Sequence, residues 1–311
     1  MKADGARILV IGAGVNGSIC ASELHKAGVD VTVLARGKRY EELCKDGVII
    51  EHPIKKTRNV TRVPVISALR ADDRYDYVLV VVRKNQVRDL LPALAANQSP
   101  AIVFMVNNPS GPDEWVAALG GERVMLGFVF GGGKRDGNII RAIRGGGLST
   151  PFGEIDGAIT PRLVRLVEIL RRADLKARVE KEMPDWLSTH AALVAPFAVL
   201  TMKHCCNTYE LAKATGDWRL LADATRDTVK VLRGLGRHVI PLSNSVIGRL
   251  PRFLAVPLYR AFLSSRLGEI GGGWHCSQAP DEMRQLAVEL KAMMQRSGLA
   301  VPALRQVLET V

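Results

Sequence analysis

The chain has 311 residues, 47% of them hydrophobic and 24% charged, so it is long enough for two folded domains and too mixed in composition for disorder. Its net charge of +12 would suit nucleic acid, but the basic residues are scattered and only 5% of residues are aromatic, so we expect a small anionic ligand instead. The longest apolar stretch, Ala191 to Met202, contains Pro196 and is shorter than the roughly 20 residues of a membrane span, which excludes an integral membrane protein.

The first half of the chain alternates short apolar runs with amphipathic stretches, a pattern typical of β-α-β units and a parallel sheet. We therefore expect a doubly wound α/β Rossmann domain over residues 1–155. The expected strands are Arg7-Ile11, Val31-Ala35, Tyr77-Val82, Ala101-Val106, Val124-Phe130 and Ile139-Ile143, and the expected helices are Val15-Ala27, Gln86-Ala96 and Pro112-Leu119.

From Thr160 onward the apolar residues recur with helical spacing, and several segments carry Pro in their first turn, where its missing N–H costs nothing. The second half thus indicates an all-α substrate and catalytic domain over residues 156–311. Its expected helices are Pro161-Ala173, Pro184-Cys205, Trp218-Leu235, Pro251-Ser265 and Pro280-Ser297.

A glycine-rich segment follows the first predicted strand and opens the first predicted helix, in the pattern G-x-G-x-x-G. The first glycine allows a tight turn, the second lets the backbone approach a pyrophosphate, and the third allows the helix to pack closely on the strand. The N–H groups at the helix N-terminus favour an anion. We expect a dinucleotide to be bound by Gly12, Ala13, Gly14, Val15, Asn16 and Gly17.

The second predicted strand ends in Arg36, followed by Gly37, Lys38 and Arg39, and no acidic residue appears before Glu41. An NAD site carries an acid here for the ribose 2′-hydroxyl, whereas a guanidinium suits a 2′-phosphate. The sequence therefore predicts NADP(H) as cofactor, with Arg36 on the phosphate.

These features together resemble the ketopantoate reductase (2-dehydropantoate 2-reductase) family over nearly the whole chain. Five short segments carry the resemblance in the family's order. They are Arg83-Lys84-Asn85-Gln86-Val87, similar to K-x-x-Q-V; Val106-Asn107-Asn108-Pro109-Ser110-Gly111, similar to N-G-x-G; Lys134-Arg135-Asp136-Gly137-Asn138, similar to R-D-G-N; Ser264-Ser265, similar to the start of S-S-M-L; and Gly298-Leu299-Ala300-Val301-Pro302, similar to G-I-x-V-P.

The resemblance implies an NADP-dependent dehydrogenase or reductase that converts a 2-keto acid or a related carbonyl acid to the hydroxy acid. It places Glu282 and Ser265 on the substrate's hydroxyl and carboxylate, and Arg83 or Lys84 beside the cofactor. Gln86 belongs to the same cofactor motif. Asn108, at the end of a predicted strand, is a further expected cofactor contact. A homodimer is compatible with this interpretation.

The chain departs from the family at the residue that donates the proton. The family's W-x-K falls on Trp186-Leu187-Ser188, so Ser188 stands in place of the lysine, and Ala192 stands in place of an asparagine. His190 is the nearest titratable side chain on the same helix and is our candidate proton donor, although a lone histidine there is equally compatible with a core role. Two residues on a helix differ by roughly 200°, so Ser188 and His190 do not face one pocket from a regular helix.

Two readings from other classes stay open: a nucleotide-binding regulator that has lost catalysis, and an opine- or 3-hydroxyacid-type dehydrogenase. No metal is expected, because the adjacent His and Cys residues at 204–206 and 275–276 lack the spacing of a tetrahedral site. The five cysteines form no C-x-x-C pair, and no signal peptide is visible, so we expect a reducing, cytoplasmic location.

Overall fold

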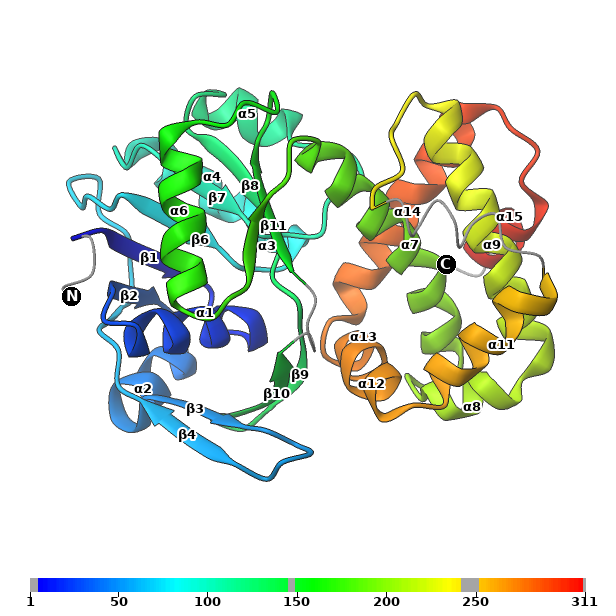
Figure 1. The fold of residues 1–311 in the computed structure, drawn as a ribbon, viewed down its shortest axis with the longest axis horizontal. Coiled ribbons are helices and arrows are strands. Elements are labelled where there is room, and N and C mark those ends of the chain that lie inside the picture. The colour runs from blue at the N-terminus through cyan, green and yellow to red at the C-terminus, as the bar shows by residue number, and fades with distance from the viewer. Residues whose placement is uncertain (1–4, 145–148, 242–251, 310–311) are drawn as a thin grey trace. The chain divides into compact units, whose positions relative to one another are not determined.

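The computed structural model describes residues 5–144, 149–241 and 252–309, and it consists of two compact units (Figure 1). The first unit comprises Met1–Val106 and Pro112–Met183, and the second comprises Asn107–Gly111 and Pro184–Val311. The short loop Asn107–Gly111 thus leaves the sheet of the first unit and belongs by its contacts to the second.

The described residues of the first unit form an eight-stranded sheet in the order β12-β11-β8-β7-β6-β1-β2-β5. Every neighbouring pair is parallel except β8 and β11. The strands are β1 (Arg7–Ile11), β2 (Asp30–Leu34), β5 (Val65–Ile66), β6 (Tyr77–Val80), β7 (Ile102–Phe104), β8 (Val124–Gly127), β11 (Thr150–Glu154) and β12 (Ala177–Val179). The helices of this unit are α1 (Val15–Lys26), α2 (Gly37–Asp46), α3 (Lys84–Val87), η1 (Arg88–Leu90), α4 (Leu91–Ala96), α5 (Asp113–Leu119) and α6 (Pro161–Arg172).

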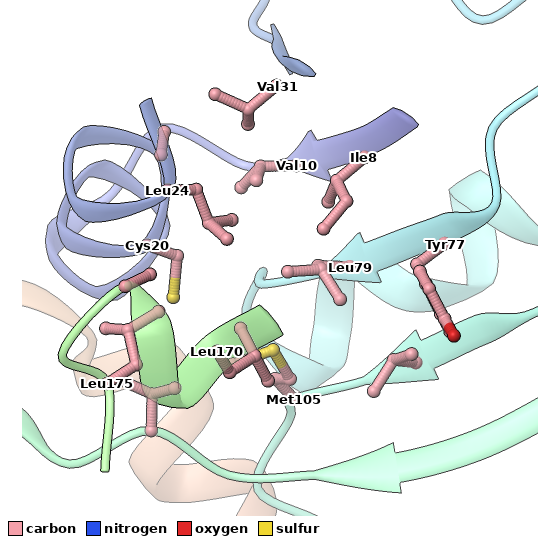
Figure 2. Packing of buried hydrophobic residues seen from close by; sticks show 14 of the residues in the cluster. Ile8, Val10, Cys20, Leu24, Val31, Tyr77, Leu79, Met105, Leu170 and Leu175 are labelled. Carbon is pink, nitrogen blue, oxygen red and sulfur yellow. The ribbon is translucent and has the colours of Figure 1, made fainter. Parts of the chain in front are cut away.

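A second sheet, in the order β4-β3-β10-β9, packs against α1. Its strands are β3 (Val48–Glu51), β4 (Arg58–Thr61), β9 (Gly131–Asp136) and β10 (Ile139–Arg144). The predicted strand Ile139-Ile143 therefore exists, but it lies in this sheet and not in the main one. The core of the unit gathers strand and helix side chains, and Figure 2 shows Ile8, Val10, Cys20, Leu24 and Leu79 pointing into the same space.

The second unit is helical. Its described elements are α7 (Met183–Lys203), α8 (Thr208–Lys213), α9 (Thr215–Gly234), α11 (Arg252–Leu263), α12 (Arg266–Gly268), the π-helical turn η2 (Glu269–Gly273), α13 (Trp274–Gln278), α14 (Pro280–Ser297) and α15 (Pro302–Leu308). Apolar residues of α7, α9, α14 and α15 form its core. Among the residues that the structure describes, no helix is both long and apolar enough to cross a membrane.

The predicted fold class is confirmed: a largely parallel α/β unit precedes a helical one. Two boundaries differ from the prediction. The division between the units falls at Met183, beyond the predicted 155, because β12 pairs with β11 and so extends the first sheet. The helix predicted to reach Cys205 ends at Lys203, because Cys205 and Cys206 both adopt positive φ values of 52° and 60°.

Candidate functional site

The glycine loop connects β1 to α1, and its three glycines differ in the space around them. Gly12 has a φ of +106°, and a Cβ there would collide with the carbonyl oxygen of Val81. A Cβ at Gly17 would collide with the carbonyl oxygen of Gly12, so the helix packs directly on the turn. Above Gly14, by contrast, a Cβ would find no atom within 4 Å. Only the middle position is open to a ligand.

The start of α1 fits an anionic dinucleotide. Gly14 is the N-cap and supplies no side-chain hydrogen bond, and no acidic residue lies in the first turn. Within the described ranges, Oδ1 of Asn16 is buried and has no hydrogen-bond partner. The site thus offers backbone N–H groups, the positive end of the helix and one acceptor, which are suited to a pyrophosphate and an adjoining hydroxyl.

The basic residues after β2 divide into an exposed group and a buried one. Arg36 is exposed at the N-cap of α2, and the first turn of that helix carries no acid. Arg39, only 8% exposed, turns inward: its Nε donates to the carbonyl oxygen of Ala13 across 3.1 Å. Burial lowers the pKa of Arg39 from its ordinary value, and the neighbouring Glu42 opposes that change. Arg36 is thus accessible to solvent, whereas Arg39 supports the loop.

The Arg83–Gln86 segment caps a helix. The N–H of Arg83 donates to Oε1 of Gln86 across 3.2 Å, which closes a capping box at the start of α3. Gln86 is exposed, and Arg83 and Lys84 are half-buried. The capping box holds the backbone from which the side chains of Arg83 and Lys84 project.

In the second unit, the loop Asn107–Gly111 is fastened at several points. The fully buried hydroxyl of Ser188 on α7 donates to the carbonyl oxygen of Pro109 across 2.8 Å. Oγ of Ser110 donates to Oε2 of Glu289 on α14 across 2.5 Å. Nδ2 of Asn108 donates to the carbonyl oxygen of Gly111 across 2.6 Å. The side chain of Asn108, which the sequence predicts to contact the cofactor, thus makes a hydrogen bond within its own loop.

Glu282, in the first turn of α14, is the centre of a polar cluster. Its side chain is 4% exposed, Nδ2 of Asn107 donates to its Oε1 across 3.4 Å, and Nε2 of His275 lies 3.8 Å from its Oε2. Oδ1 of Asn107 is buried without a hydrogen-bond partner among the described residues. A buried carboxylate, an orphaned amide oxygen and an imidazole can together hold a polar ligand and exchange a proton with it.

His190 lies next to this cluster on α7. Its ring stacks on Trp186, with 5.2 Å between centroids and 9° between planes. Desolvation, with a smaller contribution from the charge of His275, lowers the pKa of His190 to about 4. The expectation that His190 holds a proton to donate near neutral pH is therefore at odds with its surroundings, because burial disfavours the imidazolium.

Both predicted serines use their hydroxyls within the protein. Ser265 donates to the carbonyl oxygen of Phe262 across 2.7 Å and accepts from the N–H of Gly268 across 3.0 Å, which makes it the N-cap of α12. Ser188 donates to Pro109. A hydroxyl carries a single proton, so neither serine donates to a substrate without releasing these contacts. Their roles toward substrate stay predictions.

Sequence reasoning missed Asn107 and His275. Both asparagines follow the strand, so the sequence does not distinguish Asn107 from Asn108, and only the conformation of the loop decides which of them meets Glu282. From the sequence, His275 suggests only a metal ligand. Within the described ranges, no three His, Cys, Asp or Glu side chains are arranged to hold a metal ion.

The α/β unit and its glycine loop define a fold of the Rossmann type, with a helical second unit. Residues 8–157 match the family described as ketopantoate reductase PanE/ApbA, and the chain belongs to this family.

The chain is 28% identical over 180 residues to a 2-dehydropantoate 2-reductase of Archaeoglobus fulgidus, a match that covers 57% of each chain. It is also 28% identical over 128 residues to the uncharacterized oxidoreductase YkpB of Bacillus subtilis, covering 40% of this chain and 41% of that one. The chain thus spans about half the length of these curated relatives.

Solved structures share the fold. The 2-dehydropantoate 2-reductase of Geobacter metallireducens superposes with a TM-score of 0.79 at 17% identity, over 97% of this chain and 98% of that one. A ternary structure of D-mandelate dehydrogenase with NADH and anilino(oxo)acetate gives a TM-score of 0.77 at 13% identity, over 97% and 96%. At such identities the likeness concerns the fold alone.

Proposed function

We propose that the protein is an NADPH-dependent reductase that converts a 2-keto acid, or a related carbonyl acid, to the hydroxy acid. The observation that carries the proposal is the glycine loop, open above Gly14 and closed at Gly12 and Gly17, in a chain of the ketopantoate reductase family. The D-mandelate dehydrogenase of the same fold was solved with NADH and a keto-acid-like compound, which supports the substrate class.

The preference for NADPH rests on Arg36. Its guanidinium is exposed at the N-cap of α2, and no acidic residue lies in the first turn of that helix. An acidic residue there would repel a 2′-phosphate, whereas a guanidinium attracts it. Arg39 does not share this role, because its guanidinium is buried against the glycine loop.

When bound, the reduced nicotinamide supplies a hydride to the carbonyl carbon. The protein must then hold the carbonyl oxygen and neutralise the charge that develops on it. Asn107 and Glu282 are suited to accept a hydrogen bond from the hydroxyl that forms, because Nδ2 of Asn107 lies 3.4 Å from Oε1 of Glu282 and Oδ1 of Asn107 lacks a partner in the described chain. The cluster binds and orients the substrate's polar end.

Ketopantoate itself is not the substrate that we propose. Ser188 and Ala192 stand where the family resemblance puts a lysine and an asparagine, and both are fully buried. A site that lacks two polar contacts discriminates against the substrate that uses them.

A catalytically altered nucleotide-binding regulator is the second candidate. One observation favours it: the hydroxyl of Ser188 is committed to the carbonyl oxygen of Pro109 and leaves no acid at that position.

An assay of NADPH oxidation over 2-keto acids of graded size, with 3-keto acids and keto acid–amino acid pairs included, separates the candidates. We expect steady turnover with at least one 2-keto acid, and ketopantoate well below the best. Glu282→Gln should depress turnover with NADPH affinity intact. Tight NADPH binding without any turnover would instead support the regulator, and turnover only with a 3-keto acid or an amino acid pair would support the opine- or 3-hydroxyacid-type reading.

A further inference from the structure

His275 follows an irregular turn that packs against α7. Residues Glu269–Gly273 form a π-helical turn, a feature that often accompanies functional sites. A Cβ at Gly272 would collide with the ring of Phe197 on α7, so only glycine allows this close approach. The turn is also held by Trp274, whose Nε1 donates to Oε1 of Glu269 across 3.2 Å. His275 therefore follows directly on a packed turn that contacts α7.

The immediate neighbour of His275 is a buried carboxylate. Nε2 of His275 lies 3.8 Å from Oε2 of Glu282, and the side chains are 41% and 4% exposed. The other oxygen of that carboxylate, Oε1, accepts from Nδ2 of Asn107. Glu282 thus joins the imidazole to the amide whose own oxygen is buried without a partner in the described chain. A hydroxyl that donates to this oxygen, such as the one that the reduction forms, comes to the cluster in which His275 lies.

Two histidines belong to this cluster, and their surroundings differ. His190 is held neutral by desolvation and by the nearby charge of His275. His275 is partly open to water and has the carboxylate of Glu282 on its other side. At the turn itself, Glu269 pairs with Arg266 across 2.7 Å and accepts hydrogen bonds from Tyr209 and Trp274. Of the two imidazoles, His275 is the one that lies beside a carboxylate and is open to water over 41% of its side chain.

We propose that His275 donates the proton to the substrate oxygen and that Glu282 positions its imidazole, an inference that rests on the proposed reductase function. As the hydride forms the new C–H bond, the π electrons of the carbonyl move to oxygen. That oxygen takes the proton from an imidazolium N–H, which gives the hydroxy acid and neutral His275. Water then returns a proton to the ring. Ser188 is excluded as donor because its O–H is bound to Pro109.

The test compares three histidine variants in the assay with the best 2-keto acid. Loss of a positioned general acid costs about 10² to 10⁴ in rate, so His275→Gln should lower kcat by that factor, with NADPH affinity unchanged. The wild-type rate should fall as pH rises through the histidine range, and this dependence should be absent in His275→Gln. His190→Gln should lose less than tenfold. His204→Gln is the matched control, because His204 also contacts a carboxylate, Asp217 at 2.7 Å, outside the cluster.

A second measurement does not depend on turnover. Oxamate, a non-reducible analogue of a 2-keto acid, is titrated into the NADPH-loaded protein by calorimetry in buffers of different ionisation heat above neutral pH. We expect proton uptake on binding in the wild type and none in His275→Gln. If His275→Gln retains the rate, the pH profile and the proton uptake, the inference is wrong while the reductase function stands. If the wild type reduces no acid and binds no oxamate, the proposed function itself fails.

Discussion

Nε of Arg39 donates a hydrogen bond to the carbonyl oxygen of Ala13 across 3.1 Å, so a buried cation holds the glycine loop in place. The same guanidinium donates from Nη1 to the carbonyl oxygen of Asn138 across 3.1 Å and to Oε2 of Glu42 across 3.2 Å. One side chain therefore links the loop, helix α2 and the β9–β10 turn of the second sheet.

Replacing Arg39 by methionine should destabilise the protein. The variant leaves the carboxylate of Glu42 and two backbone carbonyls without their donor, which costs about 2–4 kcal/mol of unfolding free energy. Urea unfolding measures this cost, and Lys38→Met, at an exposed neighbour, should change the free energy by less than about 0.5 kcal/mol. NADPH and NADH should both bind more weakly to Arg39→Met, because the loop serves the pyrophosphate that they share. Equal stability of the two variants would show that the buried guanidinium does not support the loop.

Arg36→Ala should separate the two cofactors. A charge-assisted contact to phosphate contributes roughly 1.5–3 kcal/mol, so the variant should bind NADPH about ten- to a hundredfold more weakly and bind NADH nearly as the wild type does. Fluorescence titration with each cofactor measures both constants, and NADH serves as the internal control. The same loss for both would place Arg36 on a part of the cofactor other than the 2′-phosphate.

Much of the fold could be predicted because its signals are local. The strand, glycine turn and helix of β1 and α1 occupy consecutive residues, and the helices of the second unit follow from apolar spacing and Pro positions. The second sheet could not be predicted, because it pairs Ile139 with Ile49 across a long stretch of chain. The unit boundary was misplaced for the same reason: only the pairing of Thr150 with Ala177 shows that β12 belongs to the first sheet.

The sequence predicts several residues of the candidate site, but it does not predict which of them contact one another. Glu282 could be placed by counting from a motif, but the choice between Asn107 and Asn108 depends on the conformation of a turn that the sequence does not encode locally. In the sequence, Arg39 is one of three basic residues that follow β2, and only the packing of the folded chain shows that it is buried. His275 follows a π-helical turn, which has no periodic signal.

Ser188 variants test the role of the buried hydroxyl. Ser188→Ala leaves the carbonyl oxygen of Pro109 without its donor and should cost about 1–3 kcal/mol of unfolding free energy. Ser188→Lys should cost about 3 kcal/mol or more and should not raise turnover, because a fully buried position has neither space nor a partner for the ammonium. Ser277→Ala removes a similar bond, to the carbonyl of Trp274, at an exposed position and should cost less than about 0.5 kcal/mol. A stable Ser188→Lys enzyme with raised turnover would show that the position faces the substrate.

His190 should make stability depend on pH. Its pKa is lowered from 6.5 to about 4 in the folded protein, so the unfolded chain binds a proton at a higher pH than the folded one. The stabilisation is complete above pH 6.5, is lost progressively as pH falls toward 4 and changes no further below that, and it amounts to about 3 kcal/mol.

In urea unfolding at a series of pH values between 7 and 4, His190→Gln should therefore lose less stability on acidification than the wild type, by up to about 3 kcal/mol. His25→Gln, at an exposed position on α1, should follow the wild-type curve. The comparison isolates one residue, because the carboxylates that also titrate in this range are the same in all three proteins. Parallel curves for the wild type and His190→Gln would mean that the ring is protonated as readily in the folded protein as in the unfolded chain, and His190 would again be a candidate proton donor beside His275.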